Sequence, residues 1–597
     1  MGTVTRDAEG WGSRSIPRLI RSYSRQFWPS YAIGAVFLWL TNFLAVSIPG
    51  EIGRAVDALR ANEPLTRYAM AIALMGAAVI VVRTLSRVLI FNPGRHQEYL
   101  IRRDLFAKLM RLQPSFYADN TRGDVVSRAS NDVTWVRTLV GFGGLQVVNV
   151  AMAVSLTGWK MLTLSPALTA AALVPILVGV AAVQWGIRRL FVLSRRAQEQ
   201  LGEISEHVLG SLQGMAAIQG FVAEEAFVAR FEQRNRAWLR TGLQLALVRA
   251  VALPLVVLAG GISVFMLLAV GGPMAINGAL SVGELAAFAA LLTVLLPTLR
   301  SFGWMLSVIA RGRASLERIF ALLDAPEDRP EGAHATVTKP GRGPELILDR
   351  LSFAYPDEPQ RPVLSRISAT IPSGSLVGLF GRTGSGKSTL LRVLARLYNP
   401  PAETVFVDGE DLTAINLEAW RQRLAVVPQR PFLFSDSITS NVALAEQPDE
   451  KRVEAAVQAA ALAPDLAVLP DGLQTIVGER GIMLSGGQRQ RVALARGLYR
   501  RADLIMLDDV LAAVDHSTEA RLVDTLARLS HSDNGPTIFI ASHRLSALRT
   551  ADVVLVLDRG RLVDMGRHDE LIERPGVYRD TWLAQQAGSA AEGAAAS

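Results

Sequence analysis

The chain has 597 residues, half of them apolar, which is enough for several domains and favours a membrane protein over a soluble one. Its formal net charge of +8 would suit a nucleic-acid-binding protein, but a membrane protein with basic cytoplasmic loops gives the same total, and we expect no nucleic-acid partner. The absence of cysteine excludes disulfides, cysteine-ligated zinc and iron–sulfur clusters.

Six apolar runs occupy the first half of the chain. Residues 1–26 before them are polar and Arg-rich, and the first run is too long for the apolar core of a signal peptide, so we expect a cytoplasmic N-terminal segment. Each run is close to the ~20 residues that cross a bilayer as a helix. The runs are Tyr31–Pro49, Tyr68–Phe91, Leu145–Leu164, Ala167–Ile187, Ala246–Val270 and Glu284–Ile309. They predict an all-α transmembrane domain with six helices over residues 27–323; buried core helices of a large soluble protein are the alternative.

The loops between the runs set the expected topology. The loops after the second and fourth runs carry eight Lys or Arg residues each, whereas the regions after the first, third and fifth runs carry four in all, including Lys160 near the end of the third run. The positive-inside rule therefore places both termini and the two long loops in the cytoplasm of a multi-pass protein of the inner or plasma membrane. Apolar residues recur at helical spacing in both long loops, so we expect the spans to continue as helices and to turn near Phe116–Gly123 and Ala217–Glu225.

The second half of the chain has a different composition. Residues 324–344 are rich in Pro, Gly and charge, which predicts a linker. Over residues 345–583 short apolar strands alternate with helical segments, which predicts an α/β domain, and the Ala-, Gly- and Ser-rich tail at 584–597 is expected to be disordered. The expected strands are Leu346–Leu348, Leu376–Phe380, Leu424–Val427, Leu504–Leu507, Thr537–Ala541 and Val553–Leu557.

The first motif in the α/β domain that predicts a ligand is a phosphate-binding loop, or P-loop. Eight residues fit the pattern G-x-x-x-x-G-K-[ST]: Gly381, Arg382, Thr383, Gly384, Ser385, Gly386, Lys387 and Ser388; Thr389 follows them and completes the expected ATP-binding stretch. An apolar strand precedes this loop and a helical pattern, Leu390–Leu397, follows it, which disfavours a chance Gly-rich turn. The backbone N–H groups would cradle phosphates, Lys387 would reach the outer phosphates, and Ser388 would ligate Mg²⁺.

Further candidate site residues follow expected strands. Asp508 ends an apolar strand, as the magnesium-binding carboxylate of a P-loop fold does. Gln429 could reach the metal or the attacking water, and His543 could contact the γ-phosphate. Tyr355 lies 26 residues before Gly381 and is expected to stack on a base, although a packed surface aromatic is the alternative.

A second Gly-rich motif lies about 100 residues after the P-loop, where it opens a helix. It consists of Ser485, Gly486, Gly487 and Gln488, preceded by Leu484. One nucleotide does not need two anion-binding surfaces in one chain. Two chains facing head-to-tail would each use this signature to cap the other's ATP, which predicts a dimer that closes on ATP.

Together these motifs resemble those of an ABC transporter half-subunit of the exporter type, and the chain is most similar to bacterial multidrug-resistance-like (Mdl-type) exporters. The P-loop, Gln429, the signature, Asp508, a D-loop ending in Asp515 and His543 occur in the family's order, and Val477–Gly481 resembles the exporter X-loop. The resemblance implies a six-helix transmembrane domain joined to an ABC nucleotide-binding domain, with ATP and Mg²⁺ as cofactors. It also implies alternation between inward- and outward-facing states, and short coupling helices in the two long loops.

One position departs from the family pattern. The family places Glu directly after the magnesium Asp, as the base or water-positioning residue, whereas here Asp509 follows Asp508. The shorter side chain predicts a slow site unless the backbone shifts to compensate, and a misplacement of ~1 Å can cost ~10²-fold in rate. Family precedent then implies a heterodimer with a second ABC half-transporter that has the Glu, in which this chain's signature serves the partner's site.

The resemblance suggests drugs or lipids as cargo, and spans with few fixed charges favour amphiphilic compounds in the bilayer. Three alternatives remain open from the sequence. They are a soluble ABC ATPase of DNA repair, an ATP-gated regulatory or channel subunit, and an importer with the exporter fold.

Overall fold

The computed structural model describes residues 15–327, 341–445, 447–478 and 482–595. The chain divides into two compact units. The helical unit comprises residues 1–110 and 122–325, and the α/β unit comprises residues 111–121 and 326–597. Most of the expected linker at 324–344 and the end of the X-loop, residues 479–481, fall outside the described residues.

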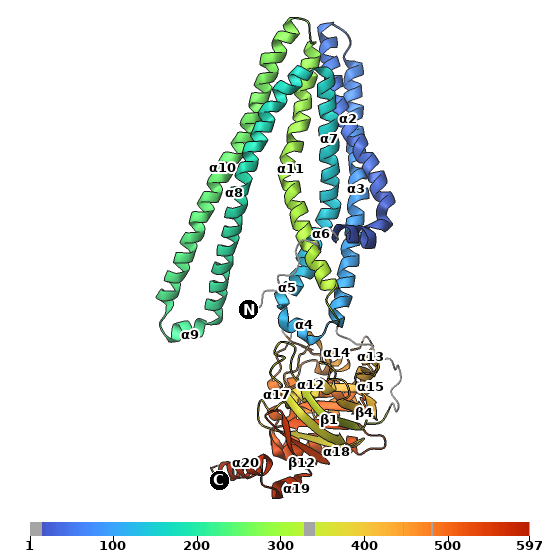
Figure 1. Cartoon of the computed structure of the whole chain (residues 1–597), viewed down its shortest axis with the longest axis vertical. Coiled ribbons are helices and arrows are strands. Elements are labelled where there is room, and N and C mark those ends of the chain that lie inside the picture. The colour runs from blue at the N-terminus through green and yellow to red at the C-terminus, as the bar shows by residue number, and fades with distance from the viewer. Residues whose placement is uncertain (1–14, 328–340, 446, 479–481, 596–597) are drawn as a thin grey trace. The chain divides into compact units, whose positions relative to one another are not determined.

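Long helices build the helical unit (Figure 1), and each expected span lies within one of them. Their bounds are α2 (Trp28–Arg60), α3 (Thr66–Arg111), α7 (Gly144–Leu164), α8 (Pro166–Gln213), α10 (Glu224–Ile276) and α11 (Val282–Leu323). Two short helical segments precede α2: η1 (Ile20–Ser24) and η2 (Arg25–Phe27). Others lie between the long helices: α5 (Arg122–Ser127), η3 (Arg128–Asp132), α6 (Val133–Thr138), η4 (Leu139–Gly143) and α9 (Met215–Gly220). Helix α4 (Pro114–Asp119) follows α3 and belongs to the α/β unit.

Within the described residues, four helical stretches are long and apolar enough to cross a membrane. They are Ser15–Arg60, Thr66–Arg111, Arg122–Leu164 and Val257–Ile276. The fourth and sixth expected spans overlap shorter apolar helical segments, Pro166–Gly179 and Val282–Thr298.

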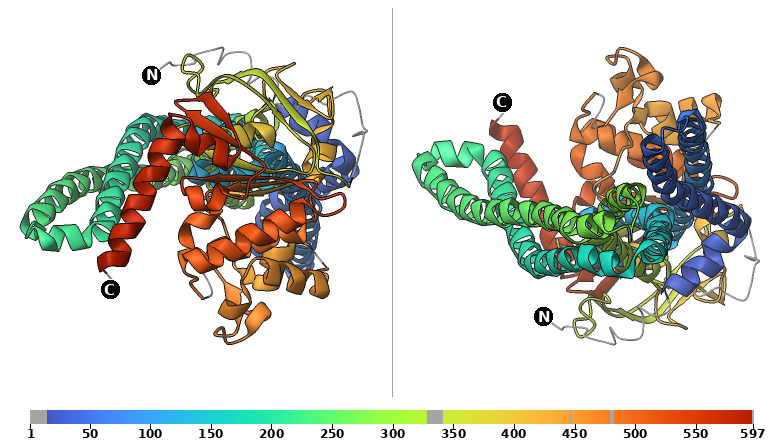
Figure 2. Two further views of the ribbon diagram at one scale, coloured as in Figure 1. Left: turned by 90° about the horizontal axis from the view of Figure 1, so that it is seen from below. Right: turned by 90° about the horizontal axis from the view of Figure 1, so that it is seen from above.

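Helices α8 and α10 continue well beyond the length of a membrane span, with 48 and 53 residues. They run side by side and are joined by α9, as both views in Figure 2 also show. The short helices α4 and α9 lie at the two turns that the sequence predicted, so the expected helical extensions of the spans are present.

A polar contact holds the start of α11 against the end of α2. Asp57 of α2 accepts hydrogen bonds from the Gly283 amide (2.7 Å) and the Ser281 hydroxyl (2.6 Å). Ser281 also caps α11 through the amide of Glu284. The two backbones approach so closely that a Cβ on Gly53 would lie 2.5 Å from the Gly283 carbonyl oxygen. A small residue is therefore required at Gly53.

The α/β unit is built on a six-stranded sheet with the order β12-β11-β3-β10-β9-β6, in which only β12 is antiparallel to its neighbour. These strands are β3 (Leu376–Phe380), β6 (Leu424–Val427), β9 (Leu504–Asp508), β10 (Thr537–Ser542), β11 (Val553–Asp558) and β12 (Arg561–Gly566). An antiparallel sheet has the order β2-β1-β4-β5, from β1 (Leu346–Phe353), β2 (Leu364–Ile371), β4 (Val405–Val407) and β5 (Glu410–Asp411). A third, two-stranded sheet pairs β7 (Asp436–Ser437) with β8 (Ile476–Val477). All six strands expected from the sequence are present, and the α/β class is confirmed.

Helices cover the main sheet on both faces. Successive β3 residues alternate between two cores, with Phe380 in one and Leu379 in the other. Helix α12 (Lys387–Leu394) packs in the core shared with the antiparallel sheet. The opposite core takes α14 (Ile438–Ala443), α15 (Glu450–Ala459), α17 (Gly486–Tyr499) and α18 (His516–Ser530). The remaining helical segments are α13 (Leu417–Gln422), α16 (Ala463–Leu466), η5 (Gly472–Gln474), η6 (Val510–Ala513), η7 (Leu545–Leu548), α19 (His568–Glu573) and α20 (Val577–Ala595).

Two helices of the α/β unit differ from the sequence prediction. The helix after the P-loop was expected over Leu390–Leu397, but α12 begins three residues earlier, at Lys387, and ends at Leu394. The tail from residue 584 was expected to be disordered, and this is wrong for residues 584–595, which continue α20. Alanine dominates this stretch and has the highest helix propensity of any residue, so a helix already anchored by its first turns can extend through it.

Candidate functional site

The P-loop connects the buried strand β3 to α12. β3 pairs in parallel with β10 and β11, which fixes its end at the centre of the sheet. Gly386, the residue before α12, has a φ of +102°, a left-handed conformation that favours glycine. The Ser385 hydroxyl is buried and has no hydrogen-bond partner within the described residues. The loop therefore has the strand–turn–helix geometry that a phosphate site requires.

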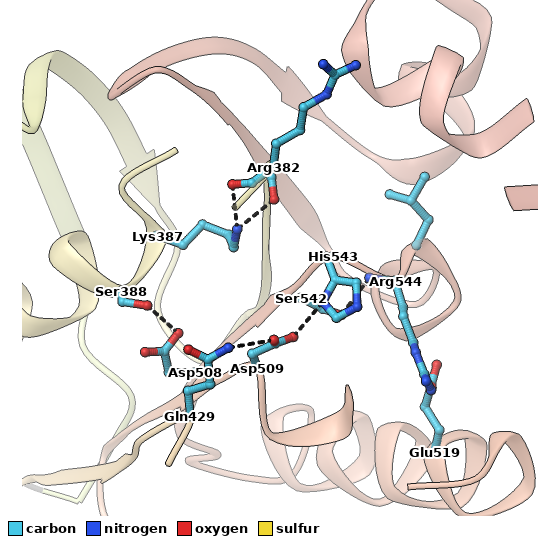
Figure 3. A network of polar contacts seen from close by, with 12 residues as sticks. Arg382, Lys387, Ser388, Gln429, Asp508, Asp509, Glu519, Ser542, His543 and Arg544 are labelled. Atoms are coloured by element: carbon cyan, nitrogen blue, oxygen red, sulfur yellow. Dashed lines mark hydrogen bonds and ion pairs between the residues drawn. The ribbon is translucent and has the colours of Figure 1, made fainter. Parts of the chain in front are cut away.

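Lys387 lies across the mouth of this loop. Its ammonium donates to the carbonyl oxygens of Gly381 (2.6 Å) and Arg382 (3.1 Å), as Figure 3 shows. Burial lowers the pKa of Lys387, and the carboxylates of Asp509 and Asp508 oppose that shift. Arg382 meets Lys387 only through its backbone, while its exposed side chain points away. An incoming phosphate can compete with the two carbonyls for the ammonium.

Two residues meet where Mg²⁺ was expected. The Ser388 hydroxyl donates to Oδ1 of Asp508, the last residue of β9, at 2.9 Å. Burial raises the pKa of Asp508, and the adjacent Asp509 carboxylate adds to the rise. A divalent cation would offset both effects, and a hydroxyl with a carboxylate is the oxygen donor set that Mg²⁺ accepts beside nucleotide phosphates. These two residues fit the ion.

Asp509 joins the other two expected catalytic residues. Oδ1 of Asp509 lies 3.0 Å from Nδ1 of His543, and Oδ2 accepts a hydrogen bond from Nε2 of Gln429 at 3.1 Å (Figure 3). The backbone of Asp509 is left-handed, with a φ of +53°, and its amide bonds to the carbonyl of Ala541 on β10. Gln429 thus contacts Asp509 in this conformation, and its expected contact with the metal stays a prediction.

Tyr355 is tethered to the P-loop helix. Its hydroxyl lies 3.0 Å from that of Thr389 and accepts a hydrogen bond from Arg392 at 3.2 Å. Its ring packs edge-on against Tyr398, with the centroids 5.0 Å apart, and against Phe353. The sequence pointed to Tyr355 but not to Arg392 or Tyr398, which belong to no motif. Stacking of Tyr355 on a base stays a prediction.

The signature forms the N-terminus of α17. Ser485 caps the helix through the Gln488 amide, and the Gln488 side chain bonds back to the Ser485 amide at 2.9 Å. Asp465 holds this turn from outside the motif, since it accepts from Gln488 and, through both oxygens, from Arg491. Ser485 and Gly486 are exposed. Within the described residues, no hydrogen bond joins the signature to this chain's own P-loop.

The D-loop residue Asp515 caps α18. Its Oδ1 accepts from the Ser517 hydroxyl (2.6 Å) and the Thr518 amide (2.9 Å). These hydrogen bonds lower the pKa of Asp515, with the Ser517 hydroxyl as the largest cause. Its carboxylate is therefore fixed by its own helix and stays charged.

Comparisons with known proteins identify both units of the chain. Residues 31–299 match the ABC transporter transmembrane region, and residues 364–512 match the ABC transporter family. The chain is 31% identical to the probable multidrug resistance ABC transporter ATP-binding/permease protein YheI of Bacillus subtilis (strain 168), over 97% of this chain and 99% of that protein. It is also 31% identical to the multidrug resistance-like ATP-binding protein MdlA of Escherichia coli (strain K12), over 94% and 95%. An ATP-dependent lipid A-core flippase of Chromohalobacter salexigens is 28% identical, over 96% of this chain and 98% of that protein.

A solved structure also shares the fold. The structure of a bacterial Atm1-family ABC exporter with ATP bound superposes with a TM-score of 0.75 at 26% identity, over 93% of this chain and 98% of that one. The transmembrane match excludes the soluble DNA-repair ATPase that the sequence left open. The chain therefore belongs to the ABC transporter family, as an exporter-type, multi-pass inner-membrane protein whose cytoplasmic domain binds and hydrolyses ATP to drive transport.

Proposed function

We propose that this chain is one half of a heterodimeric exporter, that its own ATP site is slow, and that its signature serves a competent site on a different partner chain. The observation that carries the proposal is that Asp509, and not Glu, follows the magnesium-binding Asp508. Its carboxylate is one methylene shorter than that of Glu, and it is already bonded to Gln429 and His543. An attacking water that a Glu would meet lies about 1 Å farther from this carboxylate, a displacement that can cost ~10²-fold in rate.

The chain's other residues support ATP binding at this site. Lys387 and the P-loop amides would hold the phosphates, and Ser388 with Asp508 would hold Mg²⁺. The ion, when bound, neutralises charge on the β- and γ-phosphates. His543 would contact the γ-phosphate from its place beside Asp509. This site is thus equipped to bind ATP and to promote closure of the dimer, even where its turnover is slow.

The intact signature supports a division of labour between two chains. Ser485 and Gly486 lie exposed at the start of α17, a 14-residue helix whose N-terminus favours an anion. In a head-to-tail dimer, this surface would cap the ATP of the partner, whose Glu would complete the competent site. Hydrolysis there would reset the transport cycle.

Amphiphilic compounds are the proposed cargo. The relatives are named for multidrug resistance and for lipid A-core flipping, which points to drugs or lipids as the class of cargo. An ATP-gated regulatory or channel subunit and an importer with this fold are the remaining alternatives. ATP-dependent uphill transport of a fluorescent amphiphile into inside-out vesicles would support export. ATP-gated ion currents would support a channel subunit, and ATP-dependent transport out of the vesicle lumen would support an importer.

The decisive experiment compares the ATPase activity of the chain purified alone with that of Asp509→Glu, with the oligomer mass measured in the same sample. We expect a slow wild type and activation of at least about tenfold by Glu, because the longer side chain restores the reach to water. Brisk turnover by a wild-type homodimer, unchanged by Glu, would show that Asp509 suffices and would end the heterodimer proposal.

A further inference from the structure

We propose that Gln585 of the C-terminal helix α20 is a positioning residue that fixes the backbone carrying His543. The C-terminal helix would thereby determine the position of the histidine at the ATP site. The inference depends on ATP hydrolysis by the family and not on whether the partner is a copy of this chain or a different one.

Helix α20 is anchored in the α/β unit by its first turns. Tyr578 is buried, its ring packs edge-on against Phe380 with the centroids 5.2 Å apart, and its hydroxyl lies 2.8 Å from Nδ1 of His568. Trp582 packs against His568 at 4.8 Å. Phe380 is the last residue of β3, directly before the P-loop. The base of α20 is therefore fixed to the same strand that positions the phosphate site.

The same face of α20 then reaches the segment after β10. Tyr578, Trp582 and Gln585 follow the spacing i, i+4, i+7 of one helical face. Nε2 of Gln585 donates to the carbonyl oxygen of His543 at 2.9 Å, and its Oε1 accepts from the amide of Leu545 at 3.1 Å. One side chain thus satisfies a donor and an acceptor on either side of Arg544. The Leu545 amide opens η7, where a helical N–H has no partner within its own helix.

The histidine ring itself has little else to fix it. The side chain of His543 is 53% exposed, and within the described residues its one polar contact is Asp509. A ring held so loosely takes its direction from its backbone, which is the group that Gln585 bonds. A shift of ~1 Å at such a residue is enough to change turnover.

A second helix holds the other side of the segment. Glu519 of α18, which is buried, accepts a hydrogen bond from Arg544 at 3.0 Å (Figure 3). It also accepts one from the Ser546 hydroxyl at 2.6 Å. These contacts hold side chains, whereas Gln585 holds the main chain at His543 and Leu545. The two anchors are chemically separate, so each can be removed alone.

The test uses the full chain in lipid nanodiscs. Gln585→Ala removes both hydrogen bonds and keeps a strong helix former, and Gln586→Ala is the matched control, because Gln586 is the next residue and is exposed. Hydrogen exchange of the 542–548 peptide reports the Leu545 amide directly and needs no turnover. Steady-state ATPase assays give kcat and KM for both variants. Each variant is also measured together with His543→Ala, and separately together with Asp509→Glu.

We expect Gln585→Ala, but not Gln586→Ala, to accelerate exchange in this peptide and to lower kcat about three- to tenfold with KM for ATP unchanged, as loss of one or two hydrogen bonds predicts. In the His543→Ala background the same substitution should lower kcat no further, because it acts through the histidine. Exchange unchanged by Gln585→Ala would overturn the proposal. So would an equal loss of kcat with and without His543, since that would mark a general loosening of the domain.

Discussion

The carboxylate of Asp509 lies 3.0 Å from Nδ1 of His543, so the residue that departs from the family pattern is in direct contact with the histidine that follows it. Its other oxygen is bonded to Gln429. Three motifs that are distant in sequence therefore meet at one side chain, and this contact leads to a prediction about the carboxylate's charge.

Asp509→Asn should change ATP turnover of the complex with its partner by less than about twofold, since the proposed slow site contributes little to the total. Asn keeps the size of the side chain and removes the charge that a base requires. ATPase assays of the purified complex measure this, with the exposed Asp533→Asn as the control. A tenfold loss would show that Asp509 acts as a working base, against the proposed asymmetry.

Much of this site follows from local sequence patterns. The P-loop, the strand ending in Asp508 and the capped helix at Ser485 each depend on residues that are adjacent in the chain, so spacing alone predicts them. The structure adds that Ser388 and Asp508, which are 120 residues apart, are within hydrogen-bond distance. Strands β3 and β9 both pair in parallel with β10, so their carboxyl ends lie at one edge of the sheet, which is why the sequence could anticipate that contact.

The contacts that hold these motifs could not be predicted in the same way. Asp465 fixes the signature, Glu519 and Gln585 fix the segment at His543, and Tyr398 packs against Tyr355. None of these residues lies in a recognisable pattern, because each acts through tertiary packing. The helical tail was missed for a related reason, since composition alone does not show that Tyr578 and Trp582 anchor its first turns.

Lys387→Ala should weaken ATP binding at this chain's site by about 10- to 100-fold, the expected effect of losing hydrogen bonds from a charged group. Fluorescence titration with a labelled ATP analogue measures the affinity, and the exposed Lys451→Ala is the control. Under the heterodimer proposal, turnover at the partner's site persists in part. Complete loss of turnover at both sites would contradict the asymmetric scheme, while unchanged affinity would contradict the role of Lys387.

Gly53→Ala should destabilise the helical unit by about 1–3 kcal/mol, the usual cost of overpacking. The new Cβ would lie 2.5 Å from the backbone oxygen of Gly283 and 2.9 Å from Cβ of Ala287, and neither can move without shifting α11. Gly50→Ala is the matched control one turn earlier in α2, because a Cβ there meets nothing within 4 Å. Thermal unfolding in detergent compares the two variants. Equal melting temperatures would show that α2 and α11 do not pack as closely as described.

The stability of the α/β unit should fall as the pH drops below about 6.5, and His568 should cause part of that fall. Burial lowers the pKa of His568 from its ordinary value of 6.5; the Asp569 carboxylate opposes this shift and Arg549 adds to it. The unfolded chain therefore takes up a proton at a higher pH than the folded chain, so the stabilising contribution is fully present above pH 6.5 and is lost as the pH falls toward the folded pKa.

The His568→Gln variant has no ionisable group at this position, so it should show a smaller loss of melting temperature between pH 7.5 and 5.5 than the wild type. Tyr578→Phe removes the hydroxyl that contacts His568 but leaves the His568 imidazole able to take up a proton. This variant should therefore keep the wild-type pH dependence of the melting temperature, even if it is less stable at every pH. A pH dependence that is identical in wild type and His568→Gln would show that protonation of this buried ring does not loosen the anchor of α20.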